Sequence, residues 1–202
     1  MVESYVTGLD PAREPAGVER VVATKTELIT ISGRIDRLDD RPVRLRRAEE
    51  RPGPGDRELV VVDYKTGRHA PSVDDARSSM ALALYAISAG HVLRRPCYAV
   101  ELHHLPTDRV LRWEHSERSL ERQLRRAEDI AAECAAADER FRADPQSGRG
   151  DAIFPPSPGS GCSWCDFRGV CPEGRAASAL RRPWDGLAAD DDTELGSSVR
   201  SG

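Results

Sequence analysis

The chain has 202 residues, of which 39% are hydrophobic, and a formal net charge of −4. This length and content support one ordinary hydrophobic core with little left for a second. The net acidic charge gives no support to broad non-specific DNA binding, which depends on clustered cations. The sequence contains no signal-peptide pattern and no apolar run long enough to cross a bilayer, so we expect a cytoplasmic protein.

The N-terminal half is predicted to consist mainly of β-strands. Met1–Gly17 is polar and interrupted by prolines, so we expect it to be irregular. Alternating and apolar segments then predict, in chain order, the strands Val18–Ala23, Thr26–Ile35 and Leu59–Tyr64, with an exposed loop over Arg41–Asp56 before the third strand.

The C-terminal half is predicted to be mixed. Acidic residues that follow Ser72 indicate the start of a helix. The expected elements, in chain order, are a helix over Asp74–Val92, strands at Tyr98–His104 and Val110–Trp113, and a helix over Glu117–Arg140 with apolar residues at helical spacing. The alternating Glu and Arg residues on the other face of this last helix are typical of a solvated surface.

The tripeptide Asp63-Tyr64-Lys65 closes the apolar run of the central predicted strand. Side chains two residues apart on a strand point to the same face, so Asp63 and Lys65 project together from the strand end. Lys65 is one of only two lysines in a chain rich in arginine, which suggests a need for a compact, titratable charge. A carboxylate beside an ammonium can hold a divalent metal near a phosphate. A simple strand-end ion pair is the alternative.

A second acidic segment lies upstream, where Asp36 follows the strand predicted to end at Ile35. If the two strands pair as a meander, Asp36 and Asp63 meet at one edge of the sheet. Two carboxylates near a lysine form a hard-oxygen site suited to Mg²⁺ or Mn²⁺. Alternatively, Asp36 and Asp39 are solvated residues that open a turn.

The two segments Gly33–Asp39 and Val62–Gly67 together resemble the PD-(D/E)XK nuclease superfamily, and within it the RecB-like exonucleases. The resemblance implies an α/β fold with a mixed sheet flanked by helices and a C-terminal cysteine-rich loop. It implies that Asp36, Asp63 and the backbone carbonyl of Tyr64 bind Mg²⁺ or Mn²⁺, with Glu19 as the weakest further ligand. Lys65 would orient the attacking water. The implied substrate is DNA, in repair or recombination, with a helicase or other repair protein as a partner.

The helix after the second segment departs from the family pattern. RecB-like nucleases usually carry Gln-x-x-x-Tyr there, close to the catalytic lysine. Tyr85 matches the tyrosine and is a candidate catalytic residue, whereas Ala81 stands in place of the glutamine. Tyr85 could equally be a core aromatic residue. An alternative function is therefore a non-catalytic DNA-binding or scaffolding module with a degenerate nuclease fold.

Three cysteines, Cys162, Cys165 and Cys171, lie within ten residues of each other. Without a secretion signal, this spacing favours a metal over a disulfide. The resemblance implies a [4Fe–4S] cluster, whose fourth ligand the family takes from a cysteine upstream of the nuclease strands, and this chain has none there. Zinc completed by a histidine is the alternative. We interpret Cys97 and Cys134 as structural thiols.

The predicted domain organisation is an irregular segment (1–17), a nuclease domain (18–175) that includes the cysteine cluster (162–171), and an acidic, disordered tail (176–202). RecB-like nucleases begin with a helix that packs on the sheet, and we expect no such helix in residues 1–17. We therefore expect one apolar sheet face to be poorly covered, which would promote self-association. We also expect an in-frame segment with a Cys-Pro pair upstream of Met1.

The remaining candidates for metal or catalytic roles are histidines. His103 and His104 are neighbours on a predicted strand, so their side chains face opposite ways and cannot chelate one metal together. We interpret both, and His115, as ordinary polar residues.

Overall fold

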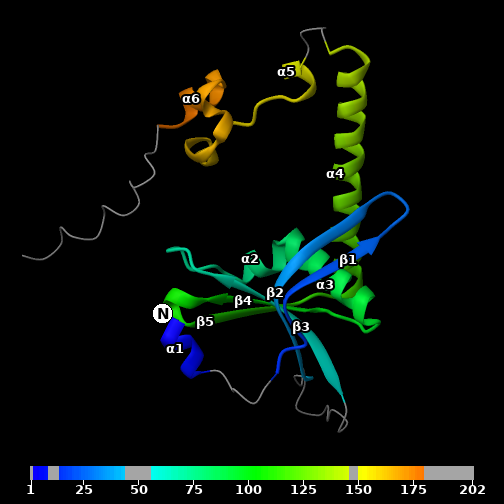
Figure 1. Cartoon of the computed structure of the whole chain (residues 1–202), viewed down its shortest axis with the longest axis vertical. Helices are drawn as coiled ribbons and strands as arrows, with labels where there is room; N and C mark the ends of the chain where they lie inside the picture. The colour runs from blue at the N-terminus through cyan, green and yellow to red at the C-terminus, as the bar shows by residue number, and fades with distance from the viewer. Residues whose placement is uncertain (1, 9–13, 44–55, 146–149, 180–202) are drawn as a thin grey trace, which may run out of the picture. The chain divides into compact units, whose positions relative to one another are not determined.

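The computed structural model describes residues 2–8, 14–43, 56–145 and 150–179 (Figure 1). The chain divides into two compact units, Met1–Ala136 and Ala137–Gly202. Most of the expected acidic tail lies outside the described residues, as does most of the expected loop between the second and third strands. Within the described ranges, no helix is both long and apolar enough to cross a membrane.

The first unit is built on a five-stranded mixed sheet in the order β1-β2-β3-β4-β5. The strands are β1 (Gly17–Lys25), β2 (Thr30–Pro42), β3 (Arg57–Lys65), β4 (Ala99–His104) and β5 (Arg109–Glu114). Only the β3–β4 pair is parallel, and it needs a crossover connection, which the helices α2 and α3 supply. The apolar run of β3 is buried because the strand is central and packed on both faces. The predicted α/β class is confirmed.

The crossover contains two helices where the sequence predicted one. Helix α2 (Val73–Ser78) ends and α3 (Met80–Leu93) begins at Ser79, whose backbone is extended and whose hydroxyl accepts the N–H of Leu82. A serine side chain that bonds to the backbone favours a helix start over a helix interior, so Ser79 divides the segment. Helices α2 and α3 lie on one face of the sheet, and the long helix α4 (Glu117–Ala143) inserts Leu120 into the same core (Figure 1).

Two strand and helix predictions near the N-terminus differ from the structure. Val2–Thr7 forms a short helix, α1, because the prolines of the expected irregular segment all lie downstream of it. Strand β2 does not end at Ile35 but continues to Pro42, pairing with β3 as far as Arg57. The expected exposed loop at Arg41 is therefore partly strand, and Asp36 lies within β2.

The face of the sheet opposite α3 carries both apolar and charged residues. Its buried apolar residues are Val60, Val62 and Ala99, which pack against Tyr64, whereas Val18 and Val110 on this face are exposed. The rest is an ionic cluster, which we call the charged face, made of Arg37, Asp39, Arg41, Glu58, Glu101, His103 and Arg112. These side chains neutralise one another, and the expected self-association stays a prediction.

Glu101 lies at the centre of the charged face and is fully buried. Arg41 donates to both of its carboxylate oxygens at 2.9 Å, and Nε2 of His103 lies 2.9 Å from Oε2. Burial alone would raise the pKa of Glu101, but the hydrogen bond from His103 and the charge of Arg41 outweigh it and lower the pKa to about 2. The carboxylate is therefore ionised at neutral pH and holds three strands together.

Helix α1 contacts the charged face through Tyr5. Its ring packs edge-on against the rings of Tyr64 and His103, and its hydroxyl lies 2.7 Å from Nδ1 of His103. Burial, followed by the neighbouring Tyr64 hydroxyl, raises the pKa of Tyr5, so its hydroxyl stays protonated and can donate to that nitrogen.

The second unit contains the end of α4 and several short elements. These are α5 (Gly150–Ile153), two 3₁₀ turns, η2 (Ser160–Trp164) and η3 (Asp166–Gly169), and α6 (Pro172–Ala177). The rings of Phe141 and Phe154 lie 5.8 Å apart and join α4 to α5. Arg168 donates to the backbone carbonyl of Ser178 at 2.7 Å, which closes the cysteine-containing turns.

Candidate active site

Asp63 and Lys65 project from the end of β3 on the same side of the sheet, as the strand period predicts. The Lys65 ammonium lies 2.7 Å from Oδ2 of Asp63. The lysine side chain is 49% exposed, whereas that of Asp63 is only 22% exposed. Among the described residues none donates a hydrogen bond of good geometry to this buried Oδ2, so the ammonium alone compensates its charge. A carboxylate oxygen has more than one lone pair, so this oxygen can bind a cation beside the ammonium.

Asp36 reaches the same strand end from β2. The paired positions of β2 and β3 run from Arg37–Val62 to Pro42–Arg57, so the ladder stops just before Asp36. Beyond the end of the ladder, the Asp36 side chain replaces a backbone acceptor, and its Oδ2 accepts the backbone N–H of Tyr64 at 3.0 Å. This bond fixes Asp36 beside the peptide that joins Asp63 to Tyr64. The predicted meander is confirmed, and it places two carboxylates at one end of the β2–β3 pair.

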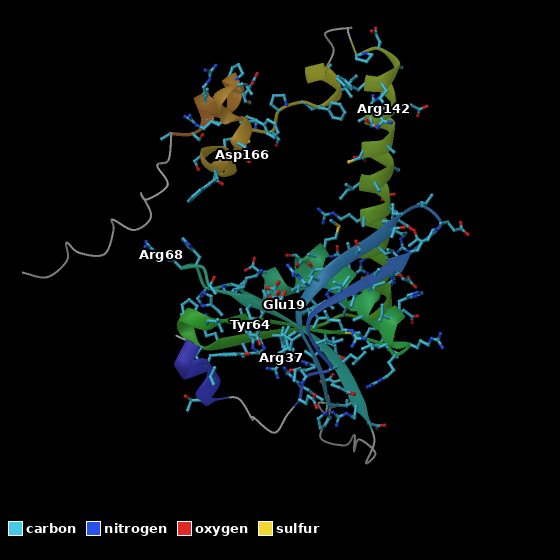
Figure 2. The ribbon with its side chains drawn as sticks, viewed as in Figure 1. Glu19, Arg37, Tyr64, Arg68, Arg142 and Asp166 are labelled. Carbon is cyan, nitrogen blue, oxygen red and sulfur yellow. The ribbon has the colours of Figure 1, made fainter. Side chains whose placement is uncertain are left out.

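A cleft of about 430 Å³ opens beside Asp63 and Lys65. One part of its wall is polar and includes His69 and Asp75, and the other part is apolar and includes Leu82 and Leu102. The remaining lining residues are Ala70, Pro71, Ser79 and Ala81. The loop after β3 contributes His69 to the wall, and Figure 2 shows its neighbour Arg68 projecting outward from this loop. Such a cleft can take an anionic group against the lysine and an apolar group against the leucines.

Ala81 lines this cleft, and Tyr85 follows one helical turn later on α3. Tyr85 packs over β2: a Cβ added to Gly33 would lie 2.4 Å from Cε1 of Tyr85, so the glycine is required for this contact. Ala81 therefore stands where a glutamine would reach the site, but its methyl group offers no hydrogen bond. Tyr85 is half-buried against the core, so its hydroxyl stays only a candidate catalytic group.

Glu19 does not join the two aspartates. It lies between the paired positions Val18–Arg37 and Arg20–Ile35 with a left-handed backbone, φ 48°. Its carboxylate instead contacts Nε of Arg34 at 3.2 Å, and both side chains are largely exposed. Figure 2 labels Glu19. Its role as a metal ligand stays a prediction.

The two carboxylates at the strand end suit a divalent cation that has few protein ligands. Across the described ranges, no three His, Cys, Asp or Glu side chains come close enough to hold one ion. Mg²⁺, however, is commonly held by one or two carboxylates with waters completing its shell. Asp63, with its buried oxygen lacking a hydrogen bond, and Asp36 fit that pattern, and the Tyr64 carbonyl would complete the set.

Three residues near the strand end were not anticipated from the sequence. His69 and Asp75 line the cleft, and His104 pairs with Lys65 across the parallel β3–β4 ladder. Asp75 is part of the N-terminal cap of α2. Its Oδ2 accepts the N–H and the hydroxyl of Ser72, and these two bonds lower the pKa of the carboxyl. The acidic start of α2 was a sequence signal for this cap. His69 lies in the loop directly after β3, and only the pairing of β4 with β3 places His104 beside Lys65.

The cysteine cluster lies in the second unit and is partly organised. Backbone N–H groups of Gly159 and Gly174 donate to the sulfurs of Cys162 and Cys171 at 3.3 and 3.2 Å, which orients both side chains. A Cβ at Gly174 would lie 3.3 Å from Sγ of Cys171 and 3.8 Å from Cβ of Cys162, so both cysteines border this glycine. Together with Cys165, however, they form no three-ligand group in the part of the chain that the structure describes. The [4Fe–4S] assignment of these cysteines therefore stays a prediction.

The other two thiols have different environments. Cys97 is buried in the main core, which confirms its structural role, and burial raises its pKa to about 12. Cys134 is exposed on α4, so its interpretation as a packed thiol is wrong. The alanine-rich stretch around it looks apolar in sequence but is largely uncovered in the described residues.

Comparison with known proteins agrees with this geometry. A family profile of the PD-(D/E)XK nuclease superfamily matches residues 1–172. No curated protein matches the chain. The profile spans most of the chain, including the sheet, the strand end with its two aspartates and lysine, and the crossover helices. The chain belongs to the PD-(D/E)XK nuclease superfamily.

Proposed function

We propose that this protein is a Mg²⁺- or Mn²⁺-dependent deoxyribonuclease of the RecB-like exonuclease type that acts in DNA repair or recombination. Membership of the superfamily indicates a nuclease-type hydrolase acting on nucleic acids. The observation that carries the proposal is the contact of 2.7 Å between Lys65 and Asp63 at the end of β3, on the wall of a cleft. Asp36, held by the Tyr64 amide, supplies the second carboxylate.

The chain's own groups suit phosphodiester hydrolysis. Asp36 and Asp63, with the Tyr64 carbonyl, would hold the cation, which when bound polarises the scissile phosphate and acidifies a water. The Lys65 ammonium is half-exposed, so it can contact the attacking water or the negative charge that develops on the phosphate. The apolar wall of the cleft excludes water from one side of the reacting group.

A metal-titrated nuclease assay tests the proposal. We expect purified protein to degrade DNA with Mg²⁺ or Mn²⁺ and to be inactive in EDTA, because the cleft supplies no other electrophile of comparable strength. Single-stranded and duplex DNA, each with labelled 5′ or 3′ ends, would identify the preferred substrate in the same experiment. Protein that is folded by circular dichroism but inactive with both metals would refute the proposal.

A second candidate is a DNA-binding or scaffolding module that has lost turnover. Ala81 favours it, because the cleft wall lacks the amide that the family usually places there. This candidate predicts DNA binding, measured by fluorescence anisotropy, with no cleavage at any metal concentration. The variant Ala81→Gln separates the two: restored or increased cleavage would show that the missing amide limits activity.

We also propose that Cys162, Cys165 and Cys171 bind metal, as an iron–sulfur cluster with a fourth ligand from elsewhere. The N–H bonds to two of the sulfurs support it. Anaerobically prepared protein should contain iron at substoichiometric occupancy with broad visible absorption, and Cys165→Ser should bleach it. Cys134→Ser, which changes an exposed thiol outside the cluster, is the control and should leave the spectrum unchanged. Full zinc occupancy without iron would contradict the cluster.

A further inference from the structure

The last residue of β4, His104, lies next to the catalytic strand end. It pairs with Lys65 as the final position of the parallel β3–β4 ladder, and paired residues of neighbouring strands face the same side of a sheet. Leu102, two residues earlier on β4, lines the cleft, so His104 lies on the cleft side as well. Its side chain is only 1% exposed.

Both ring nitrogens of His104 have partners that fix its orientation. Nε2 lies 2.7 Å from the carbonyl oxygen of Gly67, and Nδ1 lies 2.7 Å from Oγ1 of Thr107. A carbonyl oxygen can only accept, so Nε2 carries a proton and donates to Gly67. Nδ1 is hydrogen-bonded to the Thr107 hydroxyl, which can donate or accept. The imidazole therefore links the loop after β3 to the turn between β4 and β5.

The hydrogen bond from His104 to Gly67 lies just beyond the end of the β3–β4 pairing, where no ladder hydrogen bonds hold the chain. The β3–β4 pairing ends at Lys65, and the segment 66–71 is irregular before α2 begins at Val73. The same segment contributes His69, Ala70 and Pro71 to the cleft wall. Lys65 is thus held by the ladder on its N-terminal side and by the anchored Gly67 carbonyl two residues later.

We infer that His104 is a positioning residue, which fixes the loop after β3 and thereby the catalytic Lys65. The inference rests on the proposed nuclease function. Displacing a catalytic group by about 1 Å can lower a rate by on the order of 10²-fold, so losing the anchor should reduce kcat. Under the proposed function Asp36, Asp63 and the Tyr64 carbonyl would hold the metal, so we expect the KM for DNA and the Mg²⁺ concentration at half-maximal rate to change little.

The test compares substitutions that keep or remove the donor to Gly67. We expect His104→Leu to lower kcat by roughly 10- to 100-fold. His104→Gln places an amide N–H near the position of Nε2 and should recover most of the rate, whereas His104→Asn reaches only the position of Nδ1 and should not. Thr107→Val, which loses only the hydroxyl partner, should show a smaller decrease. If His104 had a purely structural role, the Gln and Asn variants would have the same kcat when compared at equal folded fraction.

A control and a second measurement keep the outcomes separate. His115→Leu makes the same change at another buried histidine, which contacts Ser119 at the start of α4, and should leave kcat unchanged. Hydrogen exchange should accelerate in residues 66–70 of His104→Leu but not of His104→Gln. Suppose that the wild-type protein is active. If His104→Leu is then equally active, or shows unchanged hydrogen exchange in residues 66–70, the inference about His104 is overturned and the proposed function is not. An inactive wild-type protein would refute the proposed function and the positioning role of His104 with it.

Discussion

Replacing Asp63 with alanine should abolish DNA cleavage, with a loss of at least about 10³-fold in kcat. The substitution removes the buried oxygen proposed to bind the cation, whose charge stabilisation amounts to several kcal/mol, and about 1.4 kcal/mol corresponds to each factor of ten. Asp63→Asn, which keeps the shape but not the charge, should behave in the same way. Single-turnover cleavage of end-labelled DNA under saturating Mg²⁺ measures the effect. Undiminished activity in Asp63→Ala would contradict the assignment.

Two further variants show whether the effect belongs to the metal. Lys65→Ala should lower the rate by about 10²- to 10³-fold, the usual consequence of removing one charge-stabilising donor, but should retain metal binding because an ammonium cannot coordinate a cation. Mn²⁺ binding measured by electron paramagnetic resonance should therefore be lost in Asp63→Ala and kept in Lys65→Ala. Asp129→Asn, at an exposed position on α4, is the matched control and should cleave at the wild-type rate.

Replacing Glu101 with glutamine should lower the free energy of unfolding at pH 7 by about 3 kcal/mol, because it removes the buried charge that Arg41 and Arg112 share and leaves each arginine with one acidic partner, Asp39 or Glu58. Urea denaturation at pH 7 measures this. Glu121→Gln, whose carboxylate lies 3.8 Å from Arg125 at the surface, is the control and should change stability by less than about 0.5 kcal/mol. A Glu101→Gln variant as stable as the wild-type protein would show that the charged face contributes nothing net.

The pH dependence of the same variant gives an independent check. The pKa of Glu101 is about 2 in the folded protein, against an ordinary value of 4.5. A folded-state pKa below the unfolded value gives stability that is present above about pH 4.5 and is lost as the pH falls towards 2. The corresponding contribution is about 3 kcal/mol. The difference in free energy of unfolding between the wild-type protein and Glu101→Gln should therefore become smaller as the pH falls from 4.5 to 2. A difference that stays constant over this range would contradict the low pKa.

The local features of the site follow from the sequence alone. The placement of Asp63 and Lys65 on one side of β3 needs only the period of two along a strand, and the apolar run before them identifies that strand as central. The long helix α4 follows in the same way from its apolar spacing. These predictions are correct because each depends on residues that are neighbours in the chain.

The remaining features depend on residues that are far apart in sequence. In sequence, the charged segment 37–41 resembles a solvated turn. In the fold, Arg41 is neutralised by Glu101, which lies sixty residues later in the chain and on another strand. Only the tertiary structure therefore shows that β2 continues through this segment. The parallel pairing of β4 with β3 likewise decides that His104 lies beside Lys65 and that Leu102 lines the cleft. Strand order is set by the packing of the whole sheet, and no local period encodes it.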